Sequence, residues 1–305
     1  MKRSAIVLAL AALLPMTITQ AFARAEPNPW RGARYVAMGA SFAAGPGLPM
    51  PRPGVPPRCG QSMVNYPTLL ATELELTLHD ASCSGATTEN VLKRWNELPP
   101  QIDALTPQTR LVTLTVGGND VNYVGGLFGA TSCELAIRAN PGKAAPCPPA
   151  RQITEAEFLK LESNLREIAM QVNARAPQAR LVFVTFLTLV PSTLCKATPI
   201  APVRADAARA LAERLAQITA RVARETGSLI VRMDEASRDH TPCDPEPWTN
   251  GAPPDHNPAL GIQWHPNPAG MRATAAAIAE TLLKPPVAAK PESRPPPETT
   301  PRPRR

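Results

Sequence analysis

Short apolar runs alternate with amphipathic stretches along most of the chain. Five runs have the character of strands, at 35–39, 76–79, 111–116, 181–187 and 228–231. Between them, apolar residues recur every three to four positions at 87–98, 154–174, 203–226 and 268–283, which predicts helices. Alternating strands and helices favour a parallel sheet that is covered by helices on both faces. The pattern therefore predicts an α/β protein with a central, mainly five-stranded sheet.

Three stretches interrupt this alternation, at 46–60, 121–150 and 237–262. They are rich in Pro and Gly, and we expect them to be long loops over the carboxyl edge of the sheet. In open α/β sheets that edge is where ligands bind. The chain from 26 to 283 is long enough for one large α/β domain, and we expect it to form a single one.

The two ends of the chain differ from this domain in composition. Lys2 and Arg3 precede an apolar run at 5–14, and small residues follow near 23–25. This is the pattern of a secretory signal peptide, here 1–25, and the run is too short to span a bilayer. Residues 284–305 contain eight prolines and few apolar side chains, so we expect a disordered, basic tail with polyproline-II character. The protein is therefore expected to be secreted, either to the periplasm or outside the cell.

The net charge of +7 is concentrated at these ends. The tail has six basic and two acidic residues, and Lys2 and Arg3 belong to the signal peptide, which leaves residues 4–283 close to neutral. The basic composition therefore gives no indication of nucleic-acid binding. A tail that contacts lipid or an acidic cell-surface polymer is conceivable, although a solvated tail without function is the simpler interpretation.

The six cysteines fit an exported protein, because oxidising compartments preserve disulfides. Pairing of neighbours predicts Cys59–Cys83, Cys133–Cys147 and Cys195–Cys243, each of which would fasten one loop-rich insertion. No two cysteines have Cys-x-x-Cys spacing, and no histidine stands at zinc-ligand spacing beside them. We therefore expect neither a metal site nor another cofactor.

Candidate chemistry follows the first three predicted strands. Ser41 lies in the block Gly-Ala-Ser-Phe-Ala-Ala-Gly after the first, Gly85 follows the second, and Asn119 stands in Gly-Gly-Asn-Asp after the third. These groups are expected to meet at one edge of the sheet, where Ser41 would be a nucleophile. The backbone N–H groups of Ser41 and Gly85, together with the Asn119 amide, would bind the oxyanion of a tetrahedral intermediate.

A base for this serine must come from one of four histidines. His79 lies inside a predicted strand, and His240 stands near a cysteine in a loop, where a hydrogen-bonding role is expected. His256 is a rival, because Asp-His-Asn-Pro mimics the later His-Pro-Asn-Pro. His265 is better placed, since an Asn N-cap and a Pro at the first helical position follow it and would hold it rigidly.

Taken together, these blocks resemble the SGNH (GDSL) hydrolase superfamily. Its four signature residues correspond to Ser41, Gly85, Asn119 and His265, and the similarity extends from about residue 34 to residue 283. With the presumed disulfides and the segment Pro-Trp-Thr-Asn-Gly at 247–251, the chain is most similar to secreted esterases and lipases of the Streptomyces type. The resemblance implies a flavodoxin-like three-layer α/β/α fold and hydrolysis of carboxylic esters without a metal.

Two positions depart from the family pattern. Ala40 replaces the acid of the usual Gly-Asp-Ser, from which we expect altered local hydrogen bonding rather than lost chemistry. The acid that the family places three residues before the histidine is Ile262 here. Because some Streptomyces-type members use a Ser–His dyad, the resemblance implies that a main-chain carbonyl, predicted to be that of Ile262, orients His265. Asp255 or Asp244 from the preceding loop is the alternative.

The expected function is hydrolysis of carboxylic esters through an acyl-enzyme. The expected substrate is a small-molecule or lipid ester, and the protein is expected to be a monomer. The stretch 121–150, with Tyr123, Leu127 and Phe128, would form part of an acyl pocket or else a disulfide-fastened surface loop. Two other functions remain open: O-deacetylation of a sugar polymer, and a catalytically silent extracellular binding module of the same fold.

Overall fold

The computed structural model describes residues 28–284, so the predicted signal peptide and all but the first residue of the predicted tail lie outside the described residues. The strands are β1 (Arg34–Gly39), β2 (Thr77–Asp80), β3 (Thr109–Thr115), β4 (Arg180–Val184) and β5 (Leu229–Val231). The α-helices are α1 (Ser41–Ala44), α2 (Tyr66–Glu73), α3 (Thr88–Leu92), α4 (Tyr123–Ala139), α5 (Glu155–Arg175), α6 (Pro202–Glu225), α7 (Met233–Ala236) and α8 (Pro268–Leu283). Short 3₁₀ turns are η1 (Pro57–Cys59), η2 (Gln101–Ala104) and η3 (Pro258–Leu260).

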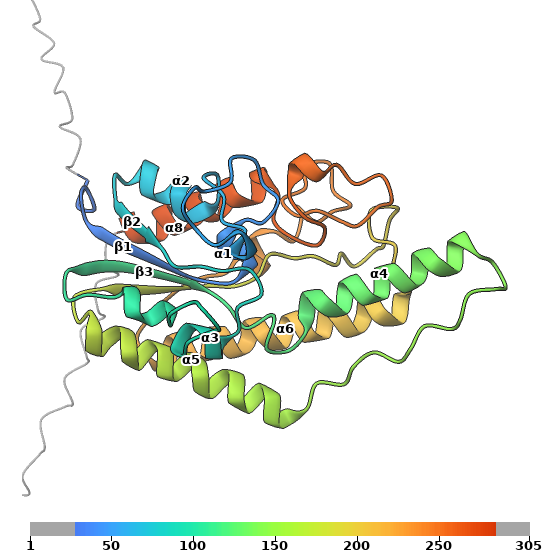
Figure 1. The fold of residues 1–305 in the computed structure, drawn as a ribbon, viewed down its shortest axis with the longest axis horizontal. Coiled ribbons are helices and arrows are strands. Elements are labelled where there is room, and N and C mark those ends of the chain that lie inside the picture. Colours follow the sequence, from blue (N-terminus) through green and yellow to red (C-terminus); the bar gives the residue numbers. More distant parts are fainter. Residues whose placement is uncertain (1–27, 285–305) are drawn as a thin grey trace, which may run out of the picture.

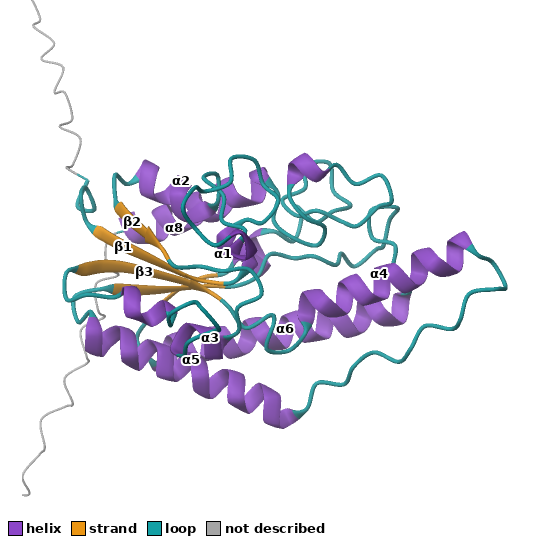
Figure 2. Cartoon of the chain, viewed as in Figure 1, coloured by secondary structure: helices purple, strands orange, loops and turns teal. Residues whose placement is uncertain are grey.

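The five strands form one parallel sheet in the order β2-β1-β3-β4-β5. Helices cover both faces: α2 and α8 pack together on one, and α3, α5 and α6 cover the other (Figure 1). This is the flavodoxin-like order, in which ligands bind where neighbouring connections leave the sheet in opposite directions, between β1 and β3. The predicted fold is confirmed, including its parallel five-stranded sheet. Long loops gather beyond the end of the sheet at which α1 lies (Figure 2).

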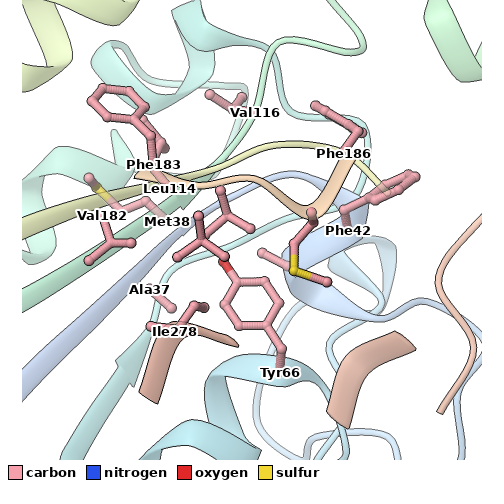
Figure 3. Close-up of a cluster of buried hydrophobic side chains, with 14 of the residues drawn as sticks. Ala37, Met38, Phe42, Tyr66, Leu114, Val116, Val182, Phe183, Phe186 and Ile278 are labelled. Carbon is pink, nitrogen blue, oxygen red and sulfur yellow. The ribbon is translucent and has the colours of Figure 1, made fainter. Parts of the chain in front are cut away.

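The core forms because the central strands β1, β3 and β4 bury residues on both of their faces. The four residues of β1 from Tyr35 to Met38 have no exposed surface, as a strand between two helical layers requires. Leu114, Val182 and Phe183 of β3 and β4 pack near Met38, and Ile278 of α8 closes the other side (Figure 3). Buried hydroxyls among them are paired, since the Tyr66 hydroxyl lies 3.0 Å from Thr115 Oγ1.

The helices with the strongest periodicity form close to where the sequence predicts them. Helix α5 begins with a capping box, in which Thr154 accepts from the Glu157 N–H and the Glu157 carboxylate accepts from the Thr154 N–H at 2.9 Å. Helix α8 occupies the predicted range, and its N-cap Asn267 accepts hydrogen bonds from the N–H groups of Ala269 and Gly270. Local capping and amphipathicity therefore agree with the tertiary structure here.

Two predictions about local structure were wrong. The helix expected at 87–98 ends at Leu92, because Asn96 adopts a left-handed φ of 55° and Trp95 pairs with Leu98 in a tight turn. The stretch 121–150, expected to be a loop, contains the 17-residue helix α4. Its glycines lowered the helical signal, but packing against α6 and a hydrogen bond from Trp264 Nε1 to Thr131 Oγ1 support the helix. Helix α2 went unpredicted, although Asn65 caps it and accepts from the Thr68 N–H.

All three predicted disulfides are present: Cys59–Cys83, Cys133–Cys147 and Cys195–Cys243. The first joins the loop after α1 to the loop after β2, and the second joins α4 to the segment that returns to α5. Among residues 28–284, no helix combines the length and the hydrophobicity that crossing a membrane requires.

Candidate active site

Ser41 is the first residue of α1, at a sharp turn directly after β1. Gly39 makes this turn with φ near 140°, and a Cβ there would lie 2.4 Å from the Thr115 carbonyl oxygen. Glycine is therefore the residue that both the conformation and the close approach of β3 require. Next to it, the Ala40 N–H donates to the same Thr115 carbonyl at 2.9 Å. The backbone around Ser41 is thus pinned to β3.

Gln101 from η2 holds the turn from the other side. Its side-chain oxygen accepts from the Gly39 N–H at 2.7 Å, and its amide nitrogen donates to the Gly39 carbonyl at 3.0 Å. The same carbonyl accepts from the Cys83 N–H at 3.0 Å, which joins the loop after β2 to the turn that carries Ser41. Gln101 had no signal in the sequence, because its function depends on a contact across 62 residues.

Ala40 is buried and makes no side-chain hydrogen bond as the N-cap of α1. The side-chain acceptor that an acid would place at this cap is missing, and backbone hydrogen bonds to β3 and to Gln101 hold the turn instead. The effect of Ala40 on the hydrogen bonding around Ser41 stays a prediction.

The His265 side chain contacts Ser41, with its Nε2 atom 2.8 Å from the serine Oγ. Its backbone is fixed on both sides. The His265 carbonyl accepts from the Asn250 N–H at 2.8 Å, and the side chain of Asn267 caps α8 and donates to the Pro247 carbonyl at 2.6 Å. The buried Trp264 adds an anchor through its bond to Thr131 of α4. Residues 224 positions apart are therefore brought into direct contact.

The group that orients His265 is the carbonyl of Gln263, which lies 2.8 Å from the histidine Nδ1. The expectation that Ile262 supplies this carbonyl was wrong, because the Ile262 carbonyl accepts instead from the Asn250 side-chain amide at 3.0 Å. Trp264 adopts a left-handed φ of 55°, and this turn folds the Gln263 carbonyl back onto the imidazole. A main-chain group leaves no trace in side-chain identity, so only the backbone path distinguishes the two positions.

The alternative acids and histidines lie elsewhere. Asp255 is exposed and 3.5 Å from Lys196, while Asp244 accepts from the N–H and hydroxyl of Thr241. His256 Nε2 lies 2.8 Å from the Gly261 carbonyl. His240 stacks on Trp248 with its Nδ1 2.8 Å from the Glu246 carbonyl, and His79 lies within β2 as expected. Of the four histidines, His265 is the one paired with Ser41.

Burial sets the protonation state of His265. Its side chain is only 4% exposed, and loss of solvation lowers its pKa from 6.5 to about 4, which the Gln263 carbonyl opposes weakly. Phe42 packs 5.1 Å from its ring and Phe128 of α4 lies 6.3 Å away, so its neighbours are aromatic. Phe42 in turn contacts Phe186, beside which it lies in Figure 3. The imidazole is therefore neutral near pH 7, with Nδ1–H donating and the Nε2 lone pair facing Ser41.

Gly85 and Asn119 lie in the loops that follow β2 and β3, and a hydrogen bond joins these two loops. Gly85 has a φ of 83° and is exposed, and the Asn119 side-chain amide donates to the carbonyl of the adjacent Ala86 at 2.9 Å. An asparagine amide has two N–H groups, so one remains available to a substrate. Within residues 28–284, no acceptor pairs with the backbone N–H of Ser41 or of Gly85.

Asp120 supports this arrangement. Its carboxylate accepts from the N–H and hydroxyl of Thr88, the first residue of α3, and burial raises its pKa. Asn164 of α5 donates to the same hydroxyl at 2.9 Å. Asp120 therefore joins the loop that carries Asn119 to two helices and does not reach His265 in any hydrogen bond.

Comparison with known proteins agrees with this geometry. The profile of the GDSL-like Lipase/Acylhydrolase family matches residues 37–273. Lipase 2 of Streptomyces coelicolor is 33% identical over 270 residues, which cover 85% of this chain and 89% of the relative. Two solved structures share the fold. Phospholipase A1 from Streptomyces albidoflavus NA297 has a TM-score of 0.62 at 23% identity, and the extracellular lipase from Streptomyces rimosus has 0.60 at 22%; each comparison covers 82% of this chain and 99% of the other.

The matched range contains all four residues that the sequence singled out, and it spans the sheet and both helical layers. Identity to the Streptomyces coelicolor relative extends over most of both chains. The chain therefore belongs to the GDSL-like lipase/acylhydrolase family and is a serine hydrolase of carboxylic esters.

Proposed function

We propose that Ser41 and His265 are the nucleophile and the general base of this esterase, acting as a dyad that the Gln263 carbonyl orients. The observation that carries the proposal is the 2.8 Å contact between Ser41 Oγ and the Nε2 atom of a buried, neutral imidazole. A serine hydroxyl needs such a base to become nucleophilic. The Gln263 carbonyl favours the tautomer that leaves Nε2 free, although it lacks the charge with which a carboxylate would stabilise imidazolium.

The reaction then proceeds in two acyl transfers. Ser41 Oγ bonds to the ester carbonyl carbon while its proton passes to His265 Nε2, and the carbonyl oxygen becomes an oxyanion. The C–O bond to the alcohol breaks, and His265 returns the proton to the leaving alkoxide. Water attacks the acyl-enzyme by the same route, so that the acid leaves and Ser41 regains its proton.

The oxyanion would be bound by the N–H groups of Ser41 and Gly85 and by the Asn119 amide. The N–H of Ser41 belongs to the open first turn of α1, and that of Gly85 lies in an exposed loop without a Cβ that would obstruct the substrate. Asn119 is held by its bond to Ala86, so it is oriented before substrate arrives. Preorganised donors of this kind typically supply the largest part of transition-state stabilisation.

Labelling with a fluorophosphonate tests the proposal directly. We expect the wild-type enzyme to be labelled on Ser41 and to hydrolyse p-nitrophenyl butyrate. Ser41→Ala and His265→Asn should lose at least about 10³-fold in kcat while remaining folded. His256→Asn is the matched control, because this histidine contacts a loop carbonyl and not Ser41. This variant should still be labelled and should still hydrolyse p-nitrophenyl butyrate. A folded wild-type protein without label would overturn the dyad and favour a binding module.

We also infer that the enzyme acts outside the cytoplasm. Three disulfides among residues 28–284 and the signal-like pattern at 1–25 support this inference. N-terminal sequencing of the protein recovered from the periplasm or the medium should begin near Arg24 or Glu26. A product retained inside the cell with its first residues intact would contradict secretion.

A further inference from the structure

A cavity of about 510 Å³ lies between α4, α6 and the segment at 148–153, away from Ser41 and His265. Figure 1 shows α4 running beside α6, with the chain from its end returning to α5. Helix α4 separates the two sites. Phe128 and Thr131 lie on the side of His265 and Trp264, whereas Gly126 and Gly129 line the cavity. We call this space the α4–α6 cavity.

Small residues keep the α4–α6 cavity open. An added Cβ at Gly126 or at Gly129 would meet no atom within 4 Å, and neither glycine has a positive φ that would require glycine. On the facing side, α6 contributes Ala207 and Ala208. Glycines inside a helix lower its stability, so helix stability alone does not account for their presence at these positions. The glycines leave the space beside them unfilled by side chains.

The α4–α6 cavity has apolar walls, and a disulfide fastens one of its sides. Leu211, Ile153 and Phe158 give it apolar walls, and Cys133 lines it while bonded to Cys147, which fastens α4 to the returning segment. Its volume falls within the range of small-molecule sites, which is roughly 300–1,000 Å³, and such sites also have mostly apolar linings.

Three arginines stand at the rim of the cavity: Arg151, Arg204 and Arg214. Arg151 pairs with Glu157, and Arg214 pairs with Glu155 while its guanidinium lies 3.7 Å from the Phe158 ring centroid. Arg204 donates to the Pro148 carbonyl, and no carboxylate of residues 28–284 pairs with it. The rim therefore holds a guanidinium whose charge is not balanced by an acidic partner.

We propose that the α4–α6 cavity binds a fatty-acid carboxylate, with its hydrocarbon chain between α4 and α6 and its head group at Arg204. The choice of ligand rests on the proposed esterase function together with the expectation that the substrate is a lipid ester, because a fatty acid is the acid product of lipid ester hydrolysis. Apolar walls take up the chain, and the Arg204 guanidinium, which donates to a carbonyl but has no acidic partner among residues 28–284, pairs with the anion through charge-assisted hydrogen bonds. Binding itself needs neither Ser41 nor His265.

Isothermal titration of the Ser41→Ala protein with decanoate, below its micelle concentration, tests the proposal. We expect saturable binding that tightens about fourfold per added CH₂ from octanoate to dodecanoate until the space is filled. Gly129→Leu, at a position where an added Cβ meets no atom within 4 Å, should occupy part of the cavity and weaken binding at least about tenfold. Arg204→Gln should weaken it about tenfold, and Arg204→Lys should restore part of the loss.

Matched controls separate this site from other effects. Ala136→Leu enlarges α4 at an exposed position outside the cavity, and Arg138→Gln removes an exposed charge that is paired with Glu134; neither should change binding. Decyltrimethylammonium, with the same chain and the opposite charge, should bind much more weakly than decanoate. Thermal unfolding verifies that each variant is folded.

Three results would overturn the proposal: no saturable binding of decanoate, equal binding by all variants, or equal binding of the cationic detergent. Sedimentation of the protein alone adds a fourth, since a dimer that Gly129→Leu disrupts would assign the cavity to a second copy of the chain. Because titration uses the Ser41→Ala protein, a wild-type enzyme that hydrolyses no ester would overturn the proposed function separately, without changing the binding result.

Discussion

Because His265 is buried, we expect the enzyme to stay active to an unusually low pH. The neutral imidazole is the form that accepts the Ser41 proton, and burial lowers its pKa to about 4. At about pH 5, roughly 90% of such an imidazole is neutral, against roughly 3% for one with the ordinary pKa near 6.5. We therefore expect kcat/KM to be nearly level from neutral pH to about pH 5. This is about 30-fold more activity at that pH than an ordinary histidine would allow.

The measurement is kcat/KM for p-nitrophenyl butyrate at a series of pH values, with the released p-nitrophenol quantified by chromatography because its absorbance changes with pH. The Ser41→Ala protein gives the background at each pH, and His256→Gln tests whether the rival histidine contributes to the profile. A half-maximal rate near pH 6.5 in the folded enzyme would refute the assignment of a buried, desolvated base.

Stability must be followed in the same experiment, since the same pKa shift affects it. His265 is harder to protonate when folded than when unfolded, so it contributes no penalty above about pH 6.5. The unfolded chain gains protons as the pH falls, and about 3 kcal/mol of stability is lost between about pH 6.5 and pH 4. Circular dichroism at each pH therefore sets the range in which the rates are interpretable. His265→Asn should lose this component of the pH dependence of unfolding.

Three further predictions follow from named contacts. Asn119→Ala should lower kcat about 10²- to 10³-fold with little change in KM, because the oxyanion forms only during the reaction. Steady-state kinetics measures kcat and KM separately. A change in KM alone would contradict the assignment of Asn119 to the oxyanion. Gln101→Leu should lower the free energy of unfolding by about 3 kcal/mol, because it leaves the buried Gly39 N–H without its partner. Urea unfolding measures this loss. An unchanged midpoint would contradict a stabilising role for the Gln101–Gly39 hydrogen bonds. Replacing Cys133 and Cys147 by Ser should lower stability by about 3 kcal/mol, given the sequence separation of 14, and thermal unfolding should then occur at lower temperature.

Elements whose local signals agree with their tertiary surroundings could be predicted from the amino-acid sequence. Helix α5 has both a capping box and an amphipathic stripe, and α8 has an Asn–Pro start, so the predicted ranges were close to the observed ones. The central strands β1, β3 and β4 could be predicted because both of their faces are buried, which makes them nearly continuous apolar runs. Pairing each cysteine with its neighbour in sequence predicted the three disulfides, and the family resemblance implied the flavodoxin-like α/β/α fold, whereas the order of the strands came from the structure.

Features that depend on contacts between residues far apart in the sequence could not be predicted and became visible in the folded chain. Helix α4 forms despite its glycines because α6 and Trp264 support it, and Gln101 reaches Gly39 from another part of the chain. The choice of Gln263 over Ile262 depends on one left-handed residue, which side-chain identity does not encode. The pKa of His265 likewise depends on what covers the ring. Residue types and their order therefore specify which chemical groups are present, whereas their distances, solvation and orientation come from packing of the folded chain.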